Sequence, residues 1–140
     1  MARHLRLIAG TGKREIFMKV AFASTDKIHI DEHFGRAEVF YLWDIGPESA
    51  EFSGIVQMDT DSEEDEADRI ESRCSNLSDC ALVYVAEIGG PAAARLVAKK
   101  IHPIKSKEHA PIAETAEKLQ QVLQGNPPPW LQKAMHKTTN

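Results

Sequence analysis

The chain is a succession of short apolar runs and of segments whose apolar residues recur at helical spacing. Five of the runs predict strands, because each is rich in β-branched, aromatic or aliphatic residues and is bounded by turn-forming or polar residues. They span residues 19–24, 38–45, 52–58, 80–86 and 101–105. The first and the fourth are almost wholly apolar, which is typical of strands buried on both faces of a sheet.

Helices are predicted after the third, fourth and fifth strands. Ser62, followed three residues later by Asp65, resembles a capping box that starts the first helix. Pro91 suits the first position of the second, which covers 92–100, and the third covers 112–124 before a glycine and three prolines end it. The expected inward-facing residues are Ala67, Ile70, Cys74 and Leu77 in the first helix, Ala93, Leu96 and Val97 in the second, and Ala116, Leu119 and Leu123 in the third.

This order of elements predicts an α/β fold with a mixed sheet. The short connections between the first three strands favour an antiparallel meander, and each later strand is reached through a helix, which favours parallel pairing. Numbered along the chain, the five strands are expected in the order 3-2-1-4-5, with strands 1, 4 and 5 parallel and helices on the faces of the sheet. The loops after strands 1 and 4 then leave the same edge, where α/β proteins bind ligands.

Length and composition fit one domain with an attachment at each end. A chain of 140 residues with 42% hydrophobic residues can form one core but is short for two domains. We expect residues 1–17 to be an appendage, either an edge strand or an arm, and residues 18–125 to form the domain. Residues 126–140 are expected to be a proline-rich turn and a short amphipathic tail, whose docking residues are Trp130, Leu131, Ala134 and Met135.

Charge is unevenly distributed. Residues 59–68 hold seven acids and no base, so the rest has 17 basic against 14 acidic residues, although the whole chain has a formal net charge of −4. A modestly basic body suits an anionic ligand, but the dense Lys/Arg stripe of a nucleic-acid binder is absent from the sequence. No apolar run is long enough for a membrane span or a signal peptide. We therefore expect a cytoplasmic protein without nucleic-acid or membrane partners.

His33 is the strongest candidate for chemistry or for ligation. It follows the first strand, and the expected topology brings it near Gly89 and Gly90, which follow the fourth. Taken alone, a histidine in this setting is more often a turn residue, Phe34 is more often a core plug, and a glycine pair is more often a structural turn. The residues by themselves leave these alternatives open.

Other candidate metal ligands are weaker. Cys74 lies on the apolar face of a predicted helix, and Cys80 begins the fourth strand at the end opposite to the histidine loop, so structural roles are favoured for both. A cluster-binding role for Cys80 would need a second docking surface or a dimer. His102 and His109 lack a third ligand, and the acidic tract lacks the glycine and the final acid of a calcium loop.

Several segments carry motifs of a known family: 18–26, 31–35, 81–95, 101–103 and 125–131. Together they resemble the dinitrogenase iron-molybdenum-cofactor biosynthesis family, and its NifX members in particular. The strand with His-Phe-Gly and the Ile-Gly-Gly piece are shared with the wider family, whereas Gly-Gly-Pro-Ala-Ala-Ala-Arg and Asn-Pro-Pro-Pro-Trp look specific to NifX. The resemblance covers residues 18 to about 137.

The resemblance implies a ribonuclease H-like α/β fold and a small carrier without catalytic turnover. Its cargo would be an iron-sulfur cluster precursor of the iron-molybdenum cofactor, and its partners the precursor synthase and the scaffold of nitrogenase cofactor assembly. Such clusters are anionic, and a carrier must release its cargo, so one neutral imidazole suits it better than several thiolates. His33 is then the metal ligand, and backbone N–H groups near Gly90 favour negative charge. The predicted cofactor-binding set is His33, Phe34, Gly35, Arg36, Gly89, Gly90 and Arg95, with the two arginines as charge partners.

Two rival functions come from other classes. A metal-dependent hydrolase is disfavoured, because the first strand presents Phe22, Ala23 and Ser24 where that fold class needs a metal-binding acid. The alternative is a protein-interaction or regulatory module of nitrogenase assembly that does not bind the cofactor, with the Trp130 tail and the acidic tract as its surfaces. A monomer or weak dimer is expected.

Overall fold

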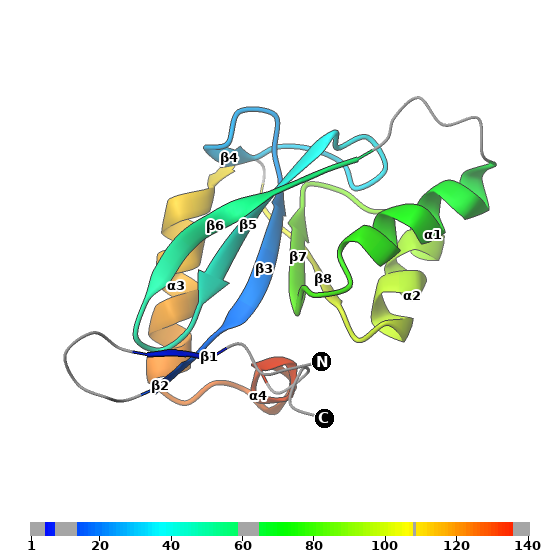
Figure 1. Cartoon of the computed structure of the whole chain (residues 1–140). Coiled ribbons are helices and arrows are strands. Elements are labelled where there is room, and N and C mark those ends of the chain that lie inside the picture. The colour runs from blue at the N-terminus through cyan, green and yellow to red at the C-terminus, as the bar shows by residue number, and fades with distance from the viewer. Residues whose placement is uncertain (1–4, 8–13, 59–64, 108, 136–140) are drawn as a thin grey trace.

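A five-stranded mixed sheet with the order β6-β5-β3-β7-β8 forms the centre of the molecule (Figure 1). The computed structural model describes residues 5–7, 14–58, 65–107 and 109–135. The strands of the sheet are β3 (Met18–Ala23), β5 (Val39–Ile45), β6 (Ala50–Gln57), β7 (Leu82–Val85) and β8 (His102–Lys105). They correspond to the five strands expected from the sequence. β3 pairs antiparallel with β5 and parallel with β7, which pairs parallel with β8.

Helices cover both faces of the sheet. α1 (Glu66–Asn76) and α2 (Gly90–Ala98) lie on one face, and α3 (Ile112–Gln124) lies on the other (Figure 1). Successive residues of a strand point to opposite faces, and the two halves of the core follow this rule. Ala21 and Ala23 of β3 belong to the half that holds α1 and α2, whereas Val20 and Phe22 belong to the half that holds α3.

The structure corrects two details of the helices on the first face. The N-cap of α1 is Asp65, whose Oδ1 accepts from the N–H of Asp68 at 2.9 Å, and Ser62 lies outside the described residues. Ala67 is exposed, so the inward face of α1 starts only at Ile70.

In α2 the buried residues are Ala92 and Leu96, whereas Val97 is 58% exposed. The reason is that α2 begins at Gly90 and presents an i, i+4 pair to the sheet, and the residue after Leu96 is turned about 100° away from that contact. The face predicted for α3 is confirmed, because Ala116, Leu119 and Leu123 are all buried.

Two small sheets complete the described fold. β1 (Leu5–Leu7) and β2 (Arg14–Ile16) pair antiparallel in a sheet of their own, so β1 does not extend the central sheet as an edge strand. β4 (His29–Ile30) and β9 (Ala110–Pro111) pair antiparallel beside the loops that follow β3 and β8. A Cβ on Gly46 would clash with the carbonyl oxygen of Ile16, so glycine permits the close approach of the β2–β3 segment to the end of β5.

The C-terminal helix α4 (Pro129–Met135) packs on the body as expected. Leu131 and Ala134 are buried in the α3 half of the core, and the Trp130 ring lies 5.3 Å from the His102 ring while it stays 44% exposed. In the described part of the chain no helix has the length and apolar character needed to cross a membrane. The ribonuclease H-like class and the division at residues 18–125 stay predictions.

Candidate functional site

The loops after β3 and β7 are fastened to each other at one end of the sheet. His33 and Glu87 form a parallel bridge, the N–H of Phe34 donates to the carbonyl oxygen of Glu87 at 2.9 Å, and the N–H of Ala86 donates to Glu32 at 2.9 Å. Because β3 and β7 are parallel, both loops leave the sheet at the same edge. The backbone that carries His33 is thereby an extension of the sheet.

His33 itself closes a tight turn. Its carbonyl oxygen accepts from the N–H groups of Arg36 at 3.1 Å and of Ala37 at 3.0 Å. The next side chain, Phe34, is 1% exposed, and its ring lies 5.7 Å from the ring of Phe40 in the core. The imidazole of His33 remains exposed. The result is a solvent-accessible imidazole on a backbone that is held by the bonds to Glu87 and by the turn itself.

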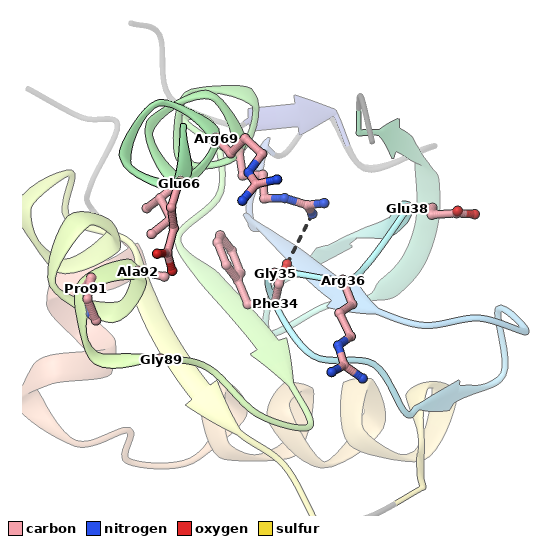
Figure 2. Close-up of a pocket in the computed structure, with 11 residues that line it drawn as sticks. Phe34, Gly35, Arg36, Glu38, Glu66, Arg69, Gly89, Pro91 and Ala92 are labelled. Atoms are coloured by element: carbon pink, nitrogen blue, oxygen red, sulfur yellow. Dashed lines mark hydrogen bonds between the residues drawn. The ribbon is translucent and has the colours of Figure 1, made fainter. Parts of the chain in front are cut away.

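Among the described residues, three hollows are lined in part by residues of this turn. The histidine hollow, about 580 Å³, is lined by His33, Gly35, Arg36, Glu87, Ile88 and Gly89. The lateral hollow shares His33 and Glu87 with it and adds Asp31, Lys105 and His109 among others. The arginine hollow, about 430 Å³, lies on the α1–α2 side, where Phe34, Arg36, Arg69, Arg73, Gly89 and Ala92 contribute to its wall (Figure 2).

The structure therefore brings His33 and Gly89 together at one mouth. Gly89 is the N-cap of α2 and has no side chain to cap the helix, and Gly90 begins the helix. The first N–H groups of any helix lack intrahelical acceptors and carry partial positive charge. Neither glycine has a left-handed φ, so the backbone conformation does not require glycine at these two positions. They leave bare backbone, because a Cβ on Gly90 would meet no atom within 4 Å.

The two candidate arginines have different surroundings. Arg36 is exposed and lines both the histidine hollow and the arginine hollow, and in Figure 2 its side chain points away from Arg69. Arg95 lies on α2 and donates from Nη1 to Oε1 of Glu71 at 2.6 Å. Lys99 pairs with the same carboxylate at 2.8 Å. Arg95 thus joins α2 to α1 and lines none of the three hollows described above.

The cysteines and the other candidate histidines do not gather around His33 in the part of the chain that the structure describes. Cys74 and Cys80 are both buried, and burial raises the pKa of the Cys74 thiol. Among the described residues, no group of three or more His, Cys, Asp and Glu side chains could hold a metal ion. His102 packs on Trp130 and the His109 ring lies 6.5 Å from His29, so these two histidines have different neighbours.

Two aspartates, Asp26 and Asp31, hold the loop between β3 and His33, which forms the rim of the site together with the loops after β7 and β8. Oδ1 of Asp26 accepts from the N–H groups of Ile28 and His29 at 2.8 Å each, and its Oδ2 lies 2.7 Å from Nδ1 of His29. The hydrogen bond to the His29 ring is the main reason that the pKa of the Asp26 carboxyl lies well below its usual value. Asp31 binds both the N–H and the hydroxyl of Thr25. These bonds within the chain fix the conformation of the loop after β3.

Arg73 is the residue of this site that the candidate set missed. It lies on α1 and is only 8% exposed, and its Nη1 donates to the carbonyl oxygens of Phe34 at 3.1 Å and Ala37 at 2.7 Å. Figure 2 shows one of these bonds as a dashed line. A signal existed, because Arg73 shares the i, i+3, i+4, i+7 spacing of Ile70, Cys74 and Leu77 and so faces the core.

Comparison with known proteins identifies the family. The model of the family "Dinitrogenase iron-molybdenum cofactor" matches residues 18–122. Protein NifX of Herbaspirillum seropedicae is 41% identical over 89% of this chain and 86% of its own length. The chain belongs to the NifX family. Protein NifX of Rhodobacter capsulatus is 39% identical over 96% of this chain and 89% of its own length.

A solved structure has the same fold. The crystal structure of PH0822 aligns with a TM-score of 0.60 over 74% of this NifX-family chain and 91% of that chain, at 20% identity. Identity at this level supports the fold alone. The family match and the NifX relatives support a role in biosynthesis of the iron-molybdenum cofactor.

Proposed function

We propose that the protein is a non-catalytic carrier that binds an iron-sulfur precursor of the iron-molybdenum cofactor and transfers it during cofactor assembly. The observation that carries the proposal is the exposed imidazole of His33 on a fixed turn, with bare backbone at Gly35 and Gly89 and the guanidinium of Arg36 at the same mouth. In this proposal His33 ligates an iron of the cargo. Its partners are the synthase that makes the precursor and the scaffold that receives it.

The chemistry of this mouth suits loading and release. Iron-sulfur clusters are ordinarily held by several thiolates, and hydrogen bonds to their sulfurs tune them. A single neutral imidazole is a weaker and more exchangeable ligand than a set of thiolates. The positive end of α2 at Gly89 and the charge of Arg36 favour an anion without a covalent bond to it. Attraction of this kind holds the cargo and leaves one metal bond to break.

Phe34, Gly35 and Gly90 have supporting roles in the proposal. The ring of Phe34 forms part of the buried floor under the turn, so its contribution is to fix the backbone. Gly35 leaves room beside the imidazole, because a Cβ there would meet no atom within 4 Å. Gly90 supplies an N–H of the first helical turn. Arg95 acts at a distance, through the α1–α2 contact.

The test is iron content after anaerobic purification from cells that make the precursor. We expect iron and a visible absorption band in the wild-type chain, and loss of both in His33→Ala with an unchanged far-UV spectrum. His109→Ala is the matched control, because His109 belongs to the same rim and shares the lateral hollow with His33. It should retain iron. Full iron content in folded His33→Ala would contradict the assignment of His33.

A colourless, iron-free wild-type protein from the same cells would contradict the carrier proposal as a whole. The alternative would then hold, in which the chain is an interaction or regulatory module of nitrogenase assembly. The Trp130 side of α4, half exposed and packed on His102, is the described surface that such a module would use. Co-purification of assembly proteins without metal, lost in Trp130→Ala, would support that alternative.

A further inference from the structure

Arg73 is a buried cation whose charge faces carbonyl oxygens. Its side chain is 8% exposed, and within the described part of the chain no carboxylate pairs with it. Burial lowers the pKa of its guanidinium, and the neighbouring Arg69 lowers it further. A buried charge without a counter-ion is costly unless its donors are well used. The structure shows one such use, the two hydrogen bonds to the His33 turn.

Those two bonds bracket the turn. The carbonyl oxygens of Phe34 and Ala37 lie on either side of Gly35 and Arg36, and both accept from the same Nη1. The side chains of Phe34 and Ala37 are 1% and 0% exposed, so their carbonyls lie close to the core. Without Arg73 both oxygens would lose a charged donor. Such bonds are shorter and stronger than those between neutral groups.

We infer that Arg73 is a positioning residue that fixes the geometry of the His33 turn from the neighbouring helix. The inference rests on the proposed function for its consequence, namely that the imidazole is presented ready for cargo. The turn has a second support in the bridge between His33 and Glu87, which holds the segment before the turn. Arg73 holds the turn itself, through the carbonyl oxygens of Phe34 and Ala37. The imidazole thus projects from a turn that is bonded both to α1 and to the segment after β7.

A charge effect is the main rival explanation, and Arg69 separates the two. Arg69 lies one turn earlier on α1 and lines the same arginine hollow. It is exposed, and the structure assigns its side chain no hydrogen bond to the turn within the described residues. Arg73→Met and Arg69→Met remove the same charge from the same hollow. They differ in the bonds to Phe34 and Ala37.

The first readout needs no cargo. Amide hydrogen exchange by NMR should quicken at Arg36 and Ala37, whose N–H groups donate to His33. We expect at least about a tenfold change in Arg73→Met, because a hydrogen bond to a charged group is commonly worth that factor or more. Arg69→Met should leave these rates near wild type. Leu77→Ala, which weakens the packing of α1 elsewhere, is the control for general destabilisation.

The second readout uses the isolated precursor cluster, supplied anaerobically to the purified full chain. We expect Arg73→Met to bind about 10- to 100-fold more weakly, the usual cost of losing a group that orients a metal ligand. Arg73→Lys keeps a donor and the charge, so it should bind the cluster more tightly than Arg73→Met. It also keeps the inference testable if the Met variant does not fold. Equal weakening in Arg69→Met would overturn the inference in favour of charge attraction.

The two readouts keep this inference separate from the proposed function. If the wild-type chain takes up no cluster, the carrier proposal fails, and the exchange rates at Arg36 and Ala37 still decide the role of Arg73. If these rates are the same in Arg73→Met and Leu77→Ala at matched stability, Arg73 has an ordinary packing role and the inference is wrong. Faster exchange in Arg73→Met alone supports it.

Discussion

The N–H of Phe34 donates to the carbonyl oxygen of Glu87 at 2.9 Å, so the turn after β3 is joined to the segment after β7. This single contact lets one residue serve two purposes. The backbone of Phe34 extends the sheet, and its side chain enters the core below the exposed imidazole of His33. The rigidity of the candidate site therefore comes from the same packing that stabilises the fold.

The first prediction concerns that packing. Phe34→Ala should lower the free energy of unfolding by about 3–5 kcal/mol, because it removes a fully buried aromatic ring and leaves a cavity. Phe34→Leu keeps most of the buried volume and should cost less. Urea denaturation followed by far-UV circular dichroism measures both. A cost below about 1 kcal/mol for the alanine variant would show that the ring is not part of the core, since surface changes stay in that range.

The second prediction concerns Gly35, where an added methyl group should affect cluster binding without lowering the stability of the fold. Gly35 has no positive φ and an added methyl would meet no atom within 4 Å. Gly35→Ala should therefore leave the free energy of unfolding unchanged or raise it by about 0.4–1 kcal/mol. In the carrier proposal it should weaken binding of the precursor cluster, because the methyl stands in the histidine hollow. Undiminished binding would mean that the cargo does not approach this backbone.

The third prediction concerns how the free energy of unfolding falls at low pH, and it depends on the carboxyl of Glu71. Hydrogen bonds from Lys99, Ser75 and Arg95, in that order of importance, lower the pKa of its carboxyl to about 2. The unfolded chain binds a proton near the ordinary value of 4.5, so it holds more protons than the folded chain between these limits. This contribution to stability is present above pH 4.5 and is lost as the pH falls toward 2.

NMR titration of the Glu71 side chain should place its midpoint near 2. Glu71→Gln should reduce the loss of unfolding free energy between pH 4.5 and 2. The matched control is Glu114→Gln, which should change this loss less, because Glu114 pairs with Lys118 within one exposed helix face. A Glu71 midpoint near 4.5 would show that its bonds to Lys99, Ser75 and Arg95 do not persist in solution.

The fourth prediction concerns the thiols. Cys74 and Cys80 are 0% and 2% exposed, so both should resist alkylation by iodoacetamide until the chain is unfolded. Cys80→Ala should retain the iron content of the wild type under the purification described above. Loss of iron in a folded Cys80→Ala protein would restore a thiolate to the ligand set and contradict a site built on imidazole alone.

The sheet could be predicted from the sequence for a simple reason. Runs such as residues 19–24 and 80–86 are short and almost wholly apolar, which is typical of strands covered on both faces. The helices between them then dictate parallel pairing. Helix faces were harder to predict, as Val97 shows: the i, i+3, i+4 spacing of Ala93, Leu96 and Val97 is compatible with one inward face, but α2 is rotated so that Ala92 and Leu96 are buried and Val97 is exposed.

The parts of the site that depend on the order of the strands could be predicted from the sequence, whereas the partners of individual side chains could not. The proximity of His33 to Gly89 follows from two parallel strands that end at one edge. Arg95 was expected to be a charge partner of the cargo beside His33, but its guanidinium reaches Glu71 instead. Arg73 was missed because arginine is ordinarily a surface residue, and only its place on the apolar face of α1 pointed inward.

The helix α4 and the strands β1 and β2 lie at the end of the molecule that is remote from β4 and from the loop that carries it (Figure 1). Immobilising the protein on a sensor surface through an engineered cysteine on the exposed side of α4, for instance at Gln132, would therefore orient the three hollows toward the flowing solution. Real-time delivery and withdrawal of cargo by other proteins could then be recorded without the support obstructing the rim.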